Sequence, residues 1–217
     1  MTHRILVLGG THGTGRLTVA QALARGHTVT ALSRHPERLE IHHPDYRTIA
    51  GDAARADVIE RALPGHDVVI STLGRGLKLS SEHLLERCMT AILPAMQRLG
   101  PRRLVFLSAF GVGDADRYAS WILRLQFRTM LASLYADKAK AETMVRRSTL
   151  DWTMVDPVLL TNRPAIEPCV AAEALWAHGV PTISRATVAD YLLKCIDDPA
   201  TIRKRMLLGP PSKMTTA

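Results

Sequence analysis

The start of the chain joins a short apolar run to a glycine-rich loop and then to a helical pattern. The run Ile5–Leu8 has the composition of a buried strand and leads directly into the loop Gly9–Gly15. The next segment, Thr14–Arg25, places apolar side chains at helical spacing and ends before Gly26. Glycines allow a tight turn at the end of a strand and close approach of a ligand to the backbone. This order predicts that the fold begins with a strand, a tight loop and a helix.

The glycine loop is also a candidate phosphate-binding site. The helix that follows it presents unpaired N–H groups and the positive end of its dipole to an anion. The spacing Gly10-x-x-Gly13-x-Gly15 differs from the strict GxGxxG pattern of dehydrogenases, and an ordinary βα turn can be glycine-rich as well. The position of the loop between the first strand and the first helix favours nucleotide binding.

The rest of the chain alternates short apolar runs with longer helical patterns, which is typical of βαβ units and a parallel sheet. Predicted strands cover 5–8, 28–32, 46–50, 67–71, 103–108, 151–155 and 205–208. Predicted helices cover 14–25, 53–63, 80–99, 117–134, 137–147 and 187–196. The predicted fold class is α/β, a Rossmann-type, doubly wound and mostly parallel sheet.

The domain organisation follows from the length. A chain of 217 residues suits one large domain, so we expect residues 1–217 to form a single dinucleotide-binding domain. The segment 161–182 contains Pro164, Pro168 and Pro181 and is expected to be an irregular, variable excursion on the substrate side. The domain is expected to carry a small irregular cap in its C-terminal part, and a polar tail over 209–217 follows the last predicted strand.

Composition excludes several classes. Hydrophobic residues at 47% and charged residues at 22% exclude a disordered chain, a collagen and a coiled coil. The 3 cysteines are far apart, and the neighbours His42 and His43 lack a third ligand at usable spacing, so no disulfide framework and no metal site are predicted. The chain lacks a signal-peptide layout at its start and an apolar stretch of membrane-spanning length. A reducing, cytoplasmic location is expected.

The net charge of +8 fits an anionic ligand better than nucleic acid, because the basic residues are scattered and form no Lys/Arg block. In the predicted helix 117–134, Arg117, Arg124 and Arg128 share one face. That helix is either a surface helix or a membrane or partner helix; we expect a surface helix that is not a membrane anchor. The expected partner is a small-molecule acceptor, without nucleic acid or membrane, for a monomer or homodimer.

The end of the second strand indicates which dinucleotide binds. A carboxylate there would bond the ribose 2′-hydroxyl of NAD, whereas an arginine would pair with the 2′-phosphate of NADP. The sequence continues Ser33-Arg34-His35-Pro36-Glu37-Arg38, without a carboxylate at the strand end. Arg34 and Arg38 are either two solvated arginines or a phosphate pair, and the guanidinium fork suits phosphate. We therefore predict NADP(H) as the cofactor.

Nearly the whole chain resembles the atypical short-chain dehydrogenases/reductases of the NAD(P)H-binding, NmrA-like group, and within it the flavin reductase (biliverdin reductase B) type. The resemblance is carried by 8–15, 33–39, 51–52, 71–74, 107–110, 150–157 and 183–190. It implies the fold and the cofactor more specifically than the substrate, because this fold supports many reactions. The glycine loop of the group matches six residues of this chain: Gly9, Thr11, His12, Gly13, Thr14 and Gly15. The two arginines that bind the 2′-phosphate in the group match Arg34 and Arg38.

The resemblance also implies the remaining cofactor contacts. Asp52 matches a residue near the adenine, and Leu73 and Gly74 match backbone that lines the cofactor. Ser108 matches the serine beside the nicotinamide, and Pro157 matches the proline of the turn that brackets the nicotinamide amide.

The chemistry beside the nicotinamide is less determined. Classical members use a serine with a YxxxK pair, in which the tyrosine donates a proton and the lysine lowers its pKa. Here Tyr135 is followed four residues later by Ala139, and the nearest lysine, Lys138, matches a residue facing the nicotinamide ribose. Tyr135 is either the acid that protonates the acceptor or a structural tyrosine. Ser108 has two possible roles as well: it orients the nicotinamide or an oxygen of the acceptor, or it forms a hydrogen bond with the local backbone.

One departure from the group is Asp156, which stands before the proline where relatives carry a basic or neutral residue. It is interpreted as a turn or cap carboxylate, or as a charge near the nicotinamide that disfavours an anionic substrate. The predicted function is NADP(H)-dependent hydride transfer to a small planar or carbonyl acceptor, of the flavin- or quinone-reductase type. The alternatives are a non-catalytic NADP(H) sensor and an isomerase or cyclase on the same fold.

Overall fold

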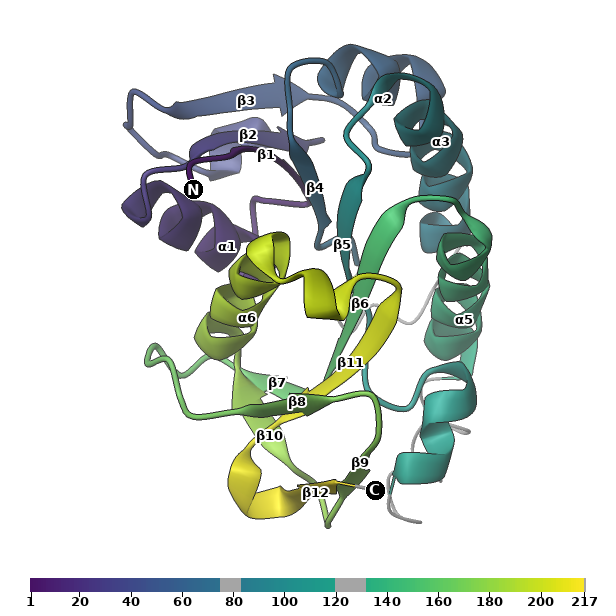
Figure 1. Cartoon of the computed structure of the whole chain (residues 1–217). Coiled ribbons are helices and arrows are strands. Elements are labelled where there is room, and N and C mark those ends of the chain that lie inside the picture. Colours follow the sequence, from purple (N-terminus) through teal and green to yellow (C-terminus); the bar gives the residue numbers. More distant parts are fainter. Residues whose placement is uncertain (75–82, 120–131, 217) are drawn as a thin grey trace.

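The computed structural model describes residues 1–74, 83–119 and 132–216, and its centre is an eight-stranded sheet (Figure 1). The strand order is β3-β2-β1-β4-β5-β6-β11-β8, with every neighbouring pair parallel except β11 and β8. Its strands are β1 (Arg4–Leu8), β2 (Thr28–Ser33), β3 (Tyr46–Ala50), β4 (Val68–Ser71), β5 (Arg103–Leu107), β6 (Asp151–Pro157), β8 (Val170–Ala172) and β11 (Lys204–Gly209). The predicted doubly wound, mostly parallel sheet is confirmed.

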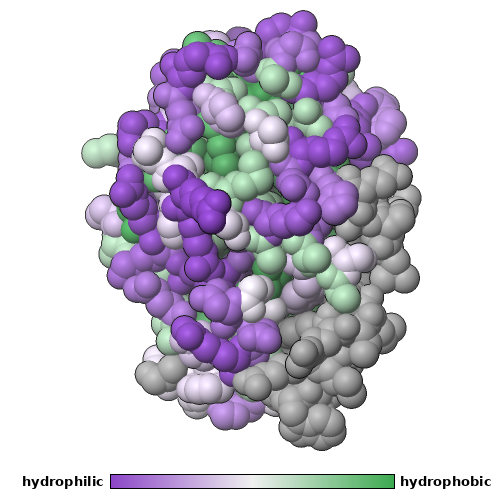
Figure 2. Space-filling view, turned by 90° about the vertical axis from the view of Figure 1, so that its right-hand side faces the viewer, coloured by the Kyte–Doolittle hydropathy of each residue, from purple (hydrophilic) through white to green (hydrophobic). Residues whose placement is uncertain are grey.

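Helices cover both faces of the sheet. On one face lie α1 (Gly13–Ala24) and α6 (Arg185–Asp197), and on the other lie α2 (Ala56–Ala62), α3 (Leu84–Leu99) and α5 (Ala132–Arg147) (Figure 1). Short 3-10 helices are η1 (Pro36–Arg38), η2 (Gly113–Tyr118), η3 (Pro199–Thr201) and η4 (Pro211–Lys213). Figure 2 shows mostly hydrophilic side chains on the surface of the α3 and α5 side.

Each face of the sheet has its own apolar core. Successive side chains of β1 alternate between the two: Ile5 packs with residues of α1 and α6, whereas Leu6 packs with residues of α2, α3 and α5. Both side chains are fully buried. This explains why the central strands are apolar without alternation.

The C-terminal part is more regular than predicted. The excursion 161–182 supplies β8, the antiparallel edge strand of the main sheet. It also supplies β9 (Leu175–Ala177), which pairs with β12 (Met214–Thr216) of the polar tail. At its two ends lie β7 (Leu159–Thr161) and β10 (Thr182–Ser184), which pair with each other. The expectation of an irregular segment was therefore wrong. These strands have three residues each, and strands this short leave little periodicity to detect.

The predicted helices 117–134 and 137–147 also differ from the structure. Residues 117 and 118 belong to η2, and α5 runs without interruption from Ala132 to Arg147. Arg124 and Arg128 lie outside the described residues, as do residues 80–82 of the predicted helix 80–99. Within the described part of the chain, no helix is long and apolar enough to cross a membrane.

Candidate functional site

The predicted cofactor residues follow the carboxyl ends of the parallel strands. In the sheet, β2 and β3 lie on one side of β1, and β4, β5 and β6 lie on the other. Doubly wound sheets bind ligands at the carboxyl edge where the strand order reverses, which here is between β1 and β4. The glycine loop after β1 and the segment Thr72–Gly74 after β4 flank this point.

At Gly9 and Gly15 the backbone of the glycine loop packs too closely against neighbouring atoms to allow a side chain. Gly9 has a φ of +84°, and a Cβ on it would lie 3.1 Å from the carbonyl oxygen of Thr72. A Cβ on Gly15 would lie 2.3 Å from the Gly9 oxygen and 2.5 Å from Thr72 Oγ1. The first turn of α1 holds no acidic side chain, and His12 makes no side-chain cap bond to it. The N-terminus of α1 is thus left to an anionic ligand.

Side chains in the loop link β1 to β2. Thr11 Oγ1 lies 2.9 Å from His12 Nδ1 and 3.2 Å from Ser33 Oγ at the end of β2. His12 has extended backbone, with φ of −141°, so its side chain is accommodated without backbone strain. Thr14, in the first turn of α1, is buried.

Arg34 and Arg38 are exposed just after β2. Neither forms an ion pair with a carboxylate among the residues that the structure describes. Arg38 belongs to η1, which begins with Pro36 and turns the chain directly after the strand. Both guanidinium groups therefore remain available to a phosphate.

Arg185 is a further cation beside the glycine loop that the sequence patterns did not indicate. It is the first residue of α6, and its Nε lies 3.5 Å from the point where a Cβ on Gly13 would stand. Its Nη1 donates to Asn162 Oδ1 at 2.7 Å, so it is positioned by an amide and keeps its charge. The only sequence feature that points to Arg185 is its position directly after Ser184, the N-cap of α6. A single arginine in this position is too common to predict a binding site.

The other predicted cofactor residues have varied surroundings. The Cα of Leu73 lies 3.3 Å from the Cβ position of Gly9, which brings the loops after β1 and β4 together. Among the described residues, no atom lies within 4 Å of the point where a Cβ on Gly74 would stand. Asp52 Oδ1 accepts a 3.0 Å hydrogen bond from the Ala54 N–H, a local turn contact. Pro157 is buried at the end of β6, and its oxygen accepts from the Phe110 N–H at 2.9 Å.

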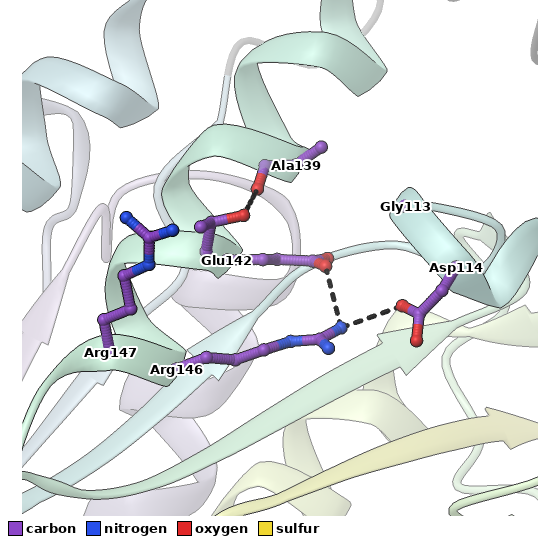
Figure 3. A pocket seen from close by; sticks show the side chains of 7 residues that line it. Gly113, Asp114, Ala139, Glu142, Arg146 and Arg147 are labelled. Atoms are coloured by element: carbon purple, nitrogen blue, oxygen red, sulfur yellow. Dashed lines mark hydrogen bonds and ion pairs between the residues drawn. The ribbon is translucent and has the colours of Figure 1, made fainter.

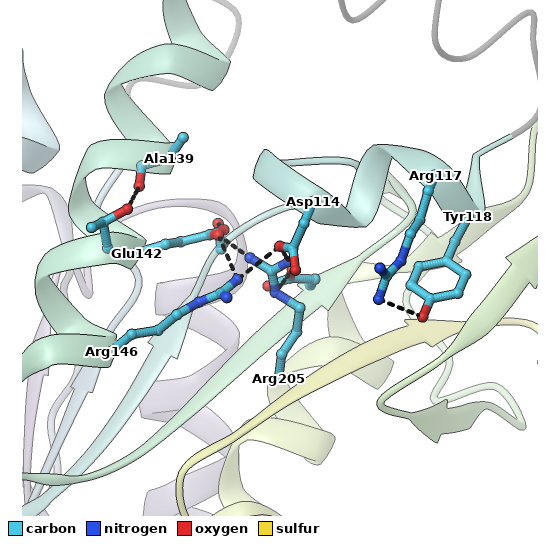
Figure 4. Close-up of polar contacts among 10 residues, drawn as sticks. Asp114, Arg117, Tyr118, Ala139, Glu142, Arg146 and Arg205 are labelled. Atoms are coloured by element: carbon cyan, nitrogen blue, oxygen red, sulfur yellow. Dashed lines mark hydrogen bonds and ion pairs between the residues drawn. The ribbon is translucent and has the colours of Figure 1, made fainter.

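Ser108 directly follows β5 and is buried beside α5. Its hydroxyl donates a 2.5 Å hydrogen bond to Glu142 Oε1, and its N–H donates to the Val155 oxygen at 2.9 Å. The other Glu142 oxygen pairs with Arg205 of β11 (Figure 4). Arg205 also contacts Asp114 at 2.6 Å and Asp156 at 3.1 Å. Sequence reasoning missed Glu142 and Arg205, because no local motif joins residues so distant in the chain.

Asp156 does not have the turn or cap role that was one interpretation of it. It lies inside β6 with 0% exposure, in an ion pair with Arg205, so it is not a turn or cap residue. Burial raises its pKa well above the usual range, and the neighbouring Glu142 raises it further. The expected effect of Asp156 on an anionic substrate stays a prediction.

Tyr135 and Lys138 lie on the same side of α5 as Glu142, at helical spacings of three and four residues. The Tyr135 hydroxyl donates to the Phe110 oxygen at 3.0 Å, and burial raises its pKa. Burial lowers the pKa of Lys138, and this effect outweighs the carboxylates of Glu142, Asp156 and Asp137, which raise the pKa. The phenol hydrogen is thus engaged by backbone, and the roles predicted for both residues remain predictions.

One group of possible metal ligands occurs among the described residues, formed by His83, Glu86 and Asp137. Protein groups already engage its carboxylates. Asp137 accepts from the N–H groups of Leu85 and Glu86, which caps α3, and Glu86 pairs with Lys140 at 3.1 Å. We assign no function to this group.

The arrangement fits a dinucleotide. The glycine loop and the N-terminus of α1 suit a pyrophosphate, with the charge of Arg185 beside them. The exposed Arg34 and Arg38 follow β2, where a 2′-phosphate would lie. Ser108 lies farther along the same sheet edge, after β5, where a nicotinamide would follow.

Comparison with known proteins agrees with this geometry. The chain is similar to an isoflavone reductase homolog of Nicotiana tabacum, with 26% identity over 97% of this chain and 69% of the relative. It is also similar to a (4-alkanoyl-5-oxo-2,5-dihydrofuran-3-yl)methyl phosphate reductase of Streptomyces griseus, with 28% identity over 94% of this chain and 63% of the relative.

Solved structures share the fold. A short-chain dehydrogenase/reductase from Veillonella parvula, in complex with NADP, has a TM-score of 0.80 at 19% identity, covering 98% of this chain and 97% of that one. The anaerobilin reductase ChuY from Escherichia coli O157:H7 has a TM-score of 0.75 at 22% identity, covering 96% and 97%. The model of the NAD(P)H-binding family matches residues 9–199, and the chain therefore belongs to that family.

Proposed function

We propose that this protein is an NADP(H)-dependent reductase of a small planar or carbonyl acceptor. The observation that carries the proposal is the pair Arg34 and Arg38, exposed after β2 with no acidic residue at the strand end to bond a ribose 2′-hydroxyl. The glycine loop supports it, because it stands between β1 and the N-terminus of α1, whose first turn holds no acidic side chain.

The bound cofactor supplies a hydride, and the chain's own residues position the reacting groups. Arg34 and Arg38 would hold the 2′-phosphate of the cofactor, and Arg185, which lies beside Gly13, would contact its pyrophosphate. Ser108 lies where it can contact the nicotinamide or an acceptor atom. The curated relatives are named as reductases, which supports reduction as the reaction class.

The acceptor class follows from the missing YxxxK pair. Tyr135 has Ala139 at the fourth position, and its hydroxyl bonds the Phe110 oxygen. A simple ketone needs an acid at the moment its alkoxide forms, whereas a reduced flavin or quinone tolerates slower protonation. We therefore expect turnover of flavins or quinones first and of aliphatic ketones last.

The experiment is NADPH oxidation, followed by absorbance, with a panel of flavins, quinones and ketones. Ser108→Ala should lower turnover more than it lowers NADPH affinity, because a contact to developing charge acts in the transition state. Tyr135→Phe should change turnover little. Abolished turnover in Tyr135→Phe would show that the tyrosine is the acid. Tight NADPH binding without oxidation by any acceptor would refute the reductase.

That last outcome would support a second candidate function, a non-catalytic NADP(H) sensor. The observation in its favour is that the Ser108 hydroxyl hydrogen is engaged by Glu142 instead of pointing freely to an acceptor. A sensor would bind a protein partner differently with NADPH and NADP⁺, which pull-down with each cofactor state would reveal.

A further inference from the structure

The buried side chain of Glu142 lies between Ser108 and a pocket. The side chain of Glu142 is 3% exposed, and its two oxygens have different partners. Oε1 accepts from the Ser108 hydroxyl at 2.5 Å, whereas Oε2 pairs with Arg205. A buried carboxylate with a serine on one oxygen is placed to exchange a proton with that serine.

The opposite side of Glu142 faces a pocket. This pocket, of about 310 Å³, is lined by Glu142 together with Gly113, Asp114, Thr143 and Arg146 (Figure 3). In the close-up the Glu142 carboxylate points toward Arg146, which in turn bonds Asp114 at 2.9 Å. Ser108 does not line this pocket. Glu142 therefore separates Ser108 from a space large and polar enough for water.

The charges around Glu142 come from four elements. Arg205 of β11 lies nearest, Arg146 and Lys138 share α5 with it, and Asp114 and Asp156 approach from η2 and β6. Burial raises the pKa of Glu142 and outweighs the opposing effects of Arg205, the Ser108 hydrogen bond, Lys138 and Arg146. Glu142 and Asp156 interact, so their titrations are coupled.

We propose that Glu142 is a positioning residue for Ser108 and returns to it the proton that the serine gives to the acceptor. This inference rests on the proposed reductase function. The acceptor gains a hydride from the cofactor, and its negatively charged oxygen or nitrogen takes the Ser108 hydroxyl proton. Ser108 Oγ then takes the proton of Glu142 Oε1. The Glu142 carboxylate, held by Arg205, regains a proton from water in the pocket, so one hydride and one proton are consumed in each turnover.

The first test is the pH dependence of NADPH oxidation by a quinone. Proton return requires protonated Glu142, so kcat should fall as pH rises through its pKa. Glu142→Gln should lower kcat about 100-fold and remove that pH dependence, while NADPH affinity stays within about threefold. Thr143→Val is the matched control: it lines the same pocket on the next residue of α5, and its kcat and pH profile should be unchanged. An unchanged profile in Glu142→Gln would overturn the proposal.

The second test needs neither cofactor nor turnover. Infrared difference titration of the wild-type protein detects protonated carboxyl groups, and Glu142→Gln identifies the band of Glu142. Because the Ser108 hydrogen bond stabilises the ionised form, Ser108→Ala should move the Glu142 titration to higher pH. An unmoved titration would show that the two groups are not coupled, and would overturn the proposal even if the enzyme is active. NADPH that stays unoxidised with a coupled titration would instead refute the reductase alone.

Discussion

The Nε of Arg185 lies 3.5 Å from the point where a Cβ on Gly13 would stand, so the start of α6 places a guanidinium against the glycine loop. Two oxygens position this side chain, Asn162 Oδ1 at 2.7 Å and the Leu160 carbonyl at 3.5 Å. Neither carries a formal charge, so Arg185 retains a full positive charge for a ligand. The contact also relates two distant segments, since α6 packs beside α1 on one face of the sheet.

Arg185→Gln should therefore weaken NADPH and NADH by the same factor. Both contain a pyrophosphate, which we propose that Arg185 contacts, and losing one charge-assisted contact costs about 1.5–3 kcal/mol, or about 10- to 100-fold in affinity. Nicotinamide fluorescence titration measures both affinities. Binding of 2′-AMP, which lacks a pyrophosphate, should be unchanged. A loss confined to NADPH would place Arg185 at the 2′-phosphate instead.

Arg34→Ala should show the opposite selectivity. Its guanidinium is expected to contact the 2′-phosphate, so NADPH affinity should fall about 10- to 100-fold while NADH affinity stays nearly constant. The same titration measures both. Arg47→Ala, which removes another exposed arginine on the neighbouring strand β3, is the control and should change neither affinity. Equal affinity of the wild-type protein for the two cofactors would contradict NADP preference.

The sheet could be predicted from the sequence because its strands are long enough to carry a pattern. The run Leu104–Leu107 and the segment Tyr46–Ala50 fall within the observed β5 and β3. The region 161–182 could not be predicted in this way. Its strand β8 has three residues and is held by pairing with β11, a contact that no local property of the sequence reports.

The candidate site divides along the same line. The glycine loop and Arg34 could be predicted from the sequence because each stands directly after a strand, and in this fold ligands bind at the carboxyl ends of the strands. Glu142 and Arg205 meet Ser108 only when α5 and β11 pack beside β5 and β6. A lone glutamate in a helix has no pattern to distinguish it from a solvated one. The interpretation of Asp156 as a turn or cap residue was wrong for this reason, since its partner Arg205 lies on another strand.

Gly15→Ala should damage both stability and cofactor binding. The added Cβ would lie 2.3 Å from the Gly9 oxygen and 2.5 Å from Thr72 Oγ1, so the glycine loop must move away from α1. Overpacking of this kind costs about 1–3 kcal/mol in the free energy of unfolding, which urea denaturation measures. For stability the control is Gly74→Ala, where a Cβ meets no atom of the described part of the chain within 4 Å. Equal unfolding curves for the Gly15 variant and the wild-type protein would mean that the loop is not closely packed.

Asp156→Asn should change how the free energy of unfolding depends on pH. Burial, and after it the charge of Glu142, raises the pKa of Asp156 above its value of about 3.9 in an unfolded chain. The folded protein therefore holds this proton more tightly, and the resulting stability is complete below about pH 4 and is lost as pH rises through the folded-state pKa. Asparagine cannot ionise, so the variant should gain stability relative to the wild-type protein as pH increases. Urea unfolding between about pH 5 and pH 9 measures this difference.

The control for this prediction is Asp67→Asn. A hydrogen bond from Arg4 lowers the pKa of Asp67, so the stability that Asp67 contributes is lost only at lower pH. The difference in free energy of unfolding between Asp67→Asn and the wild-type protein should therefore be constant over this pH range. A constant difference for Asp156→Asn as well would mean that Arg205 keeps Asp156 ionised at every pH tested, and that its charge is fully compensated inside the sheet.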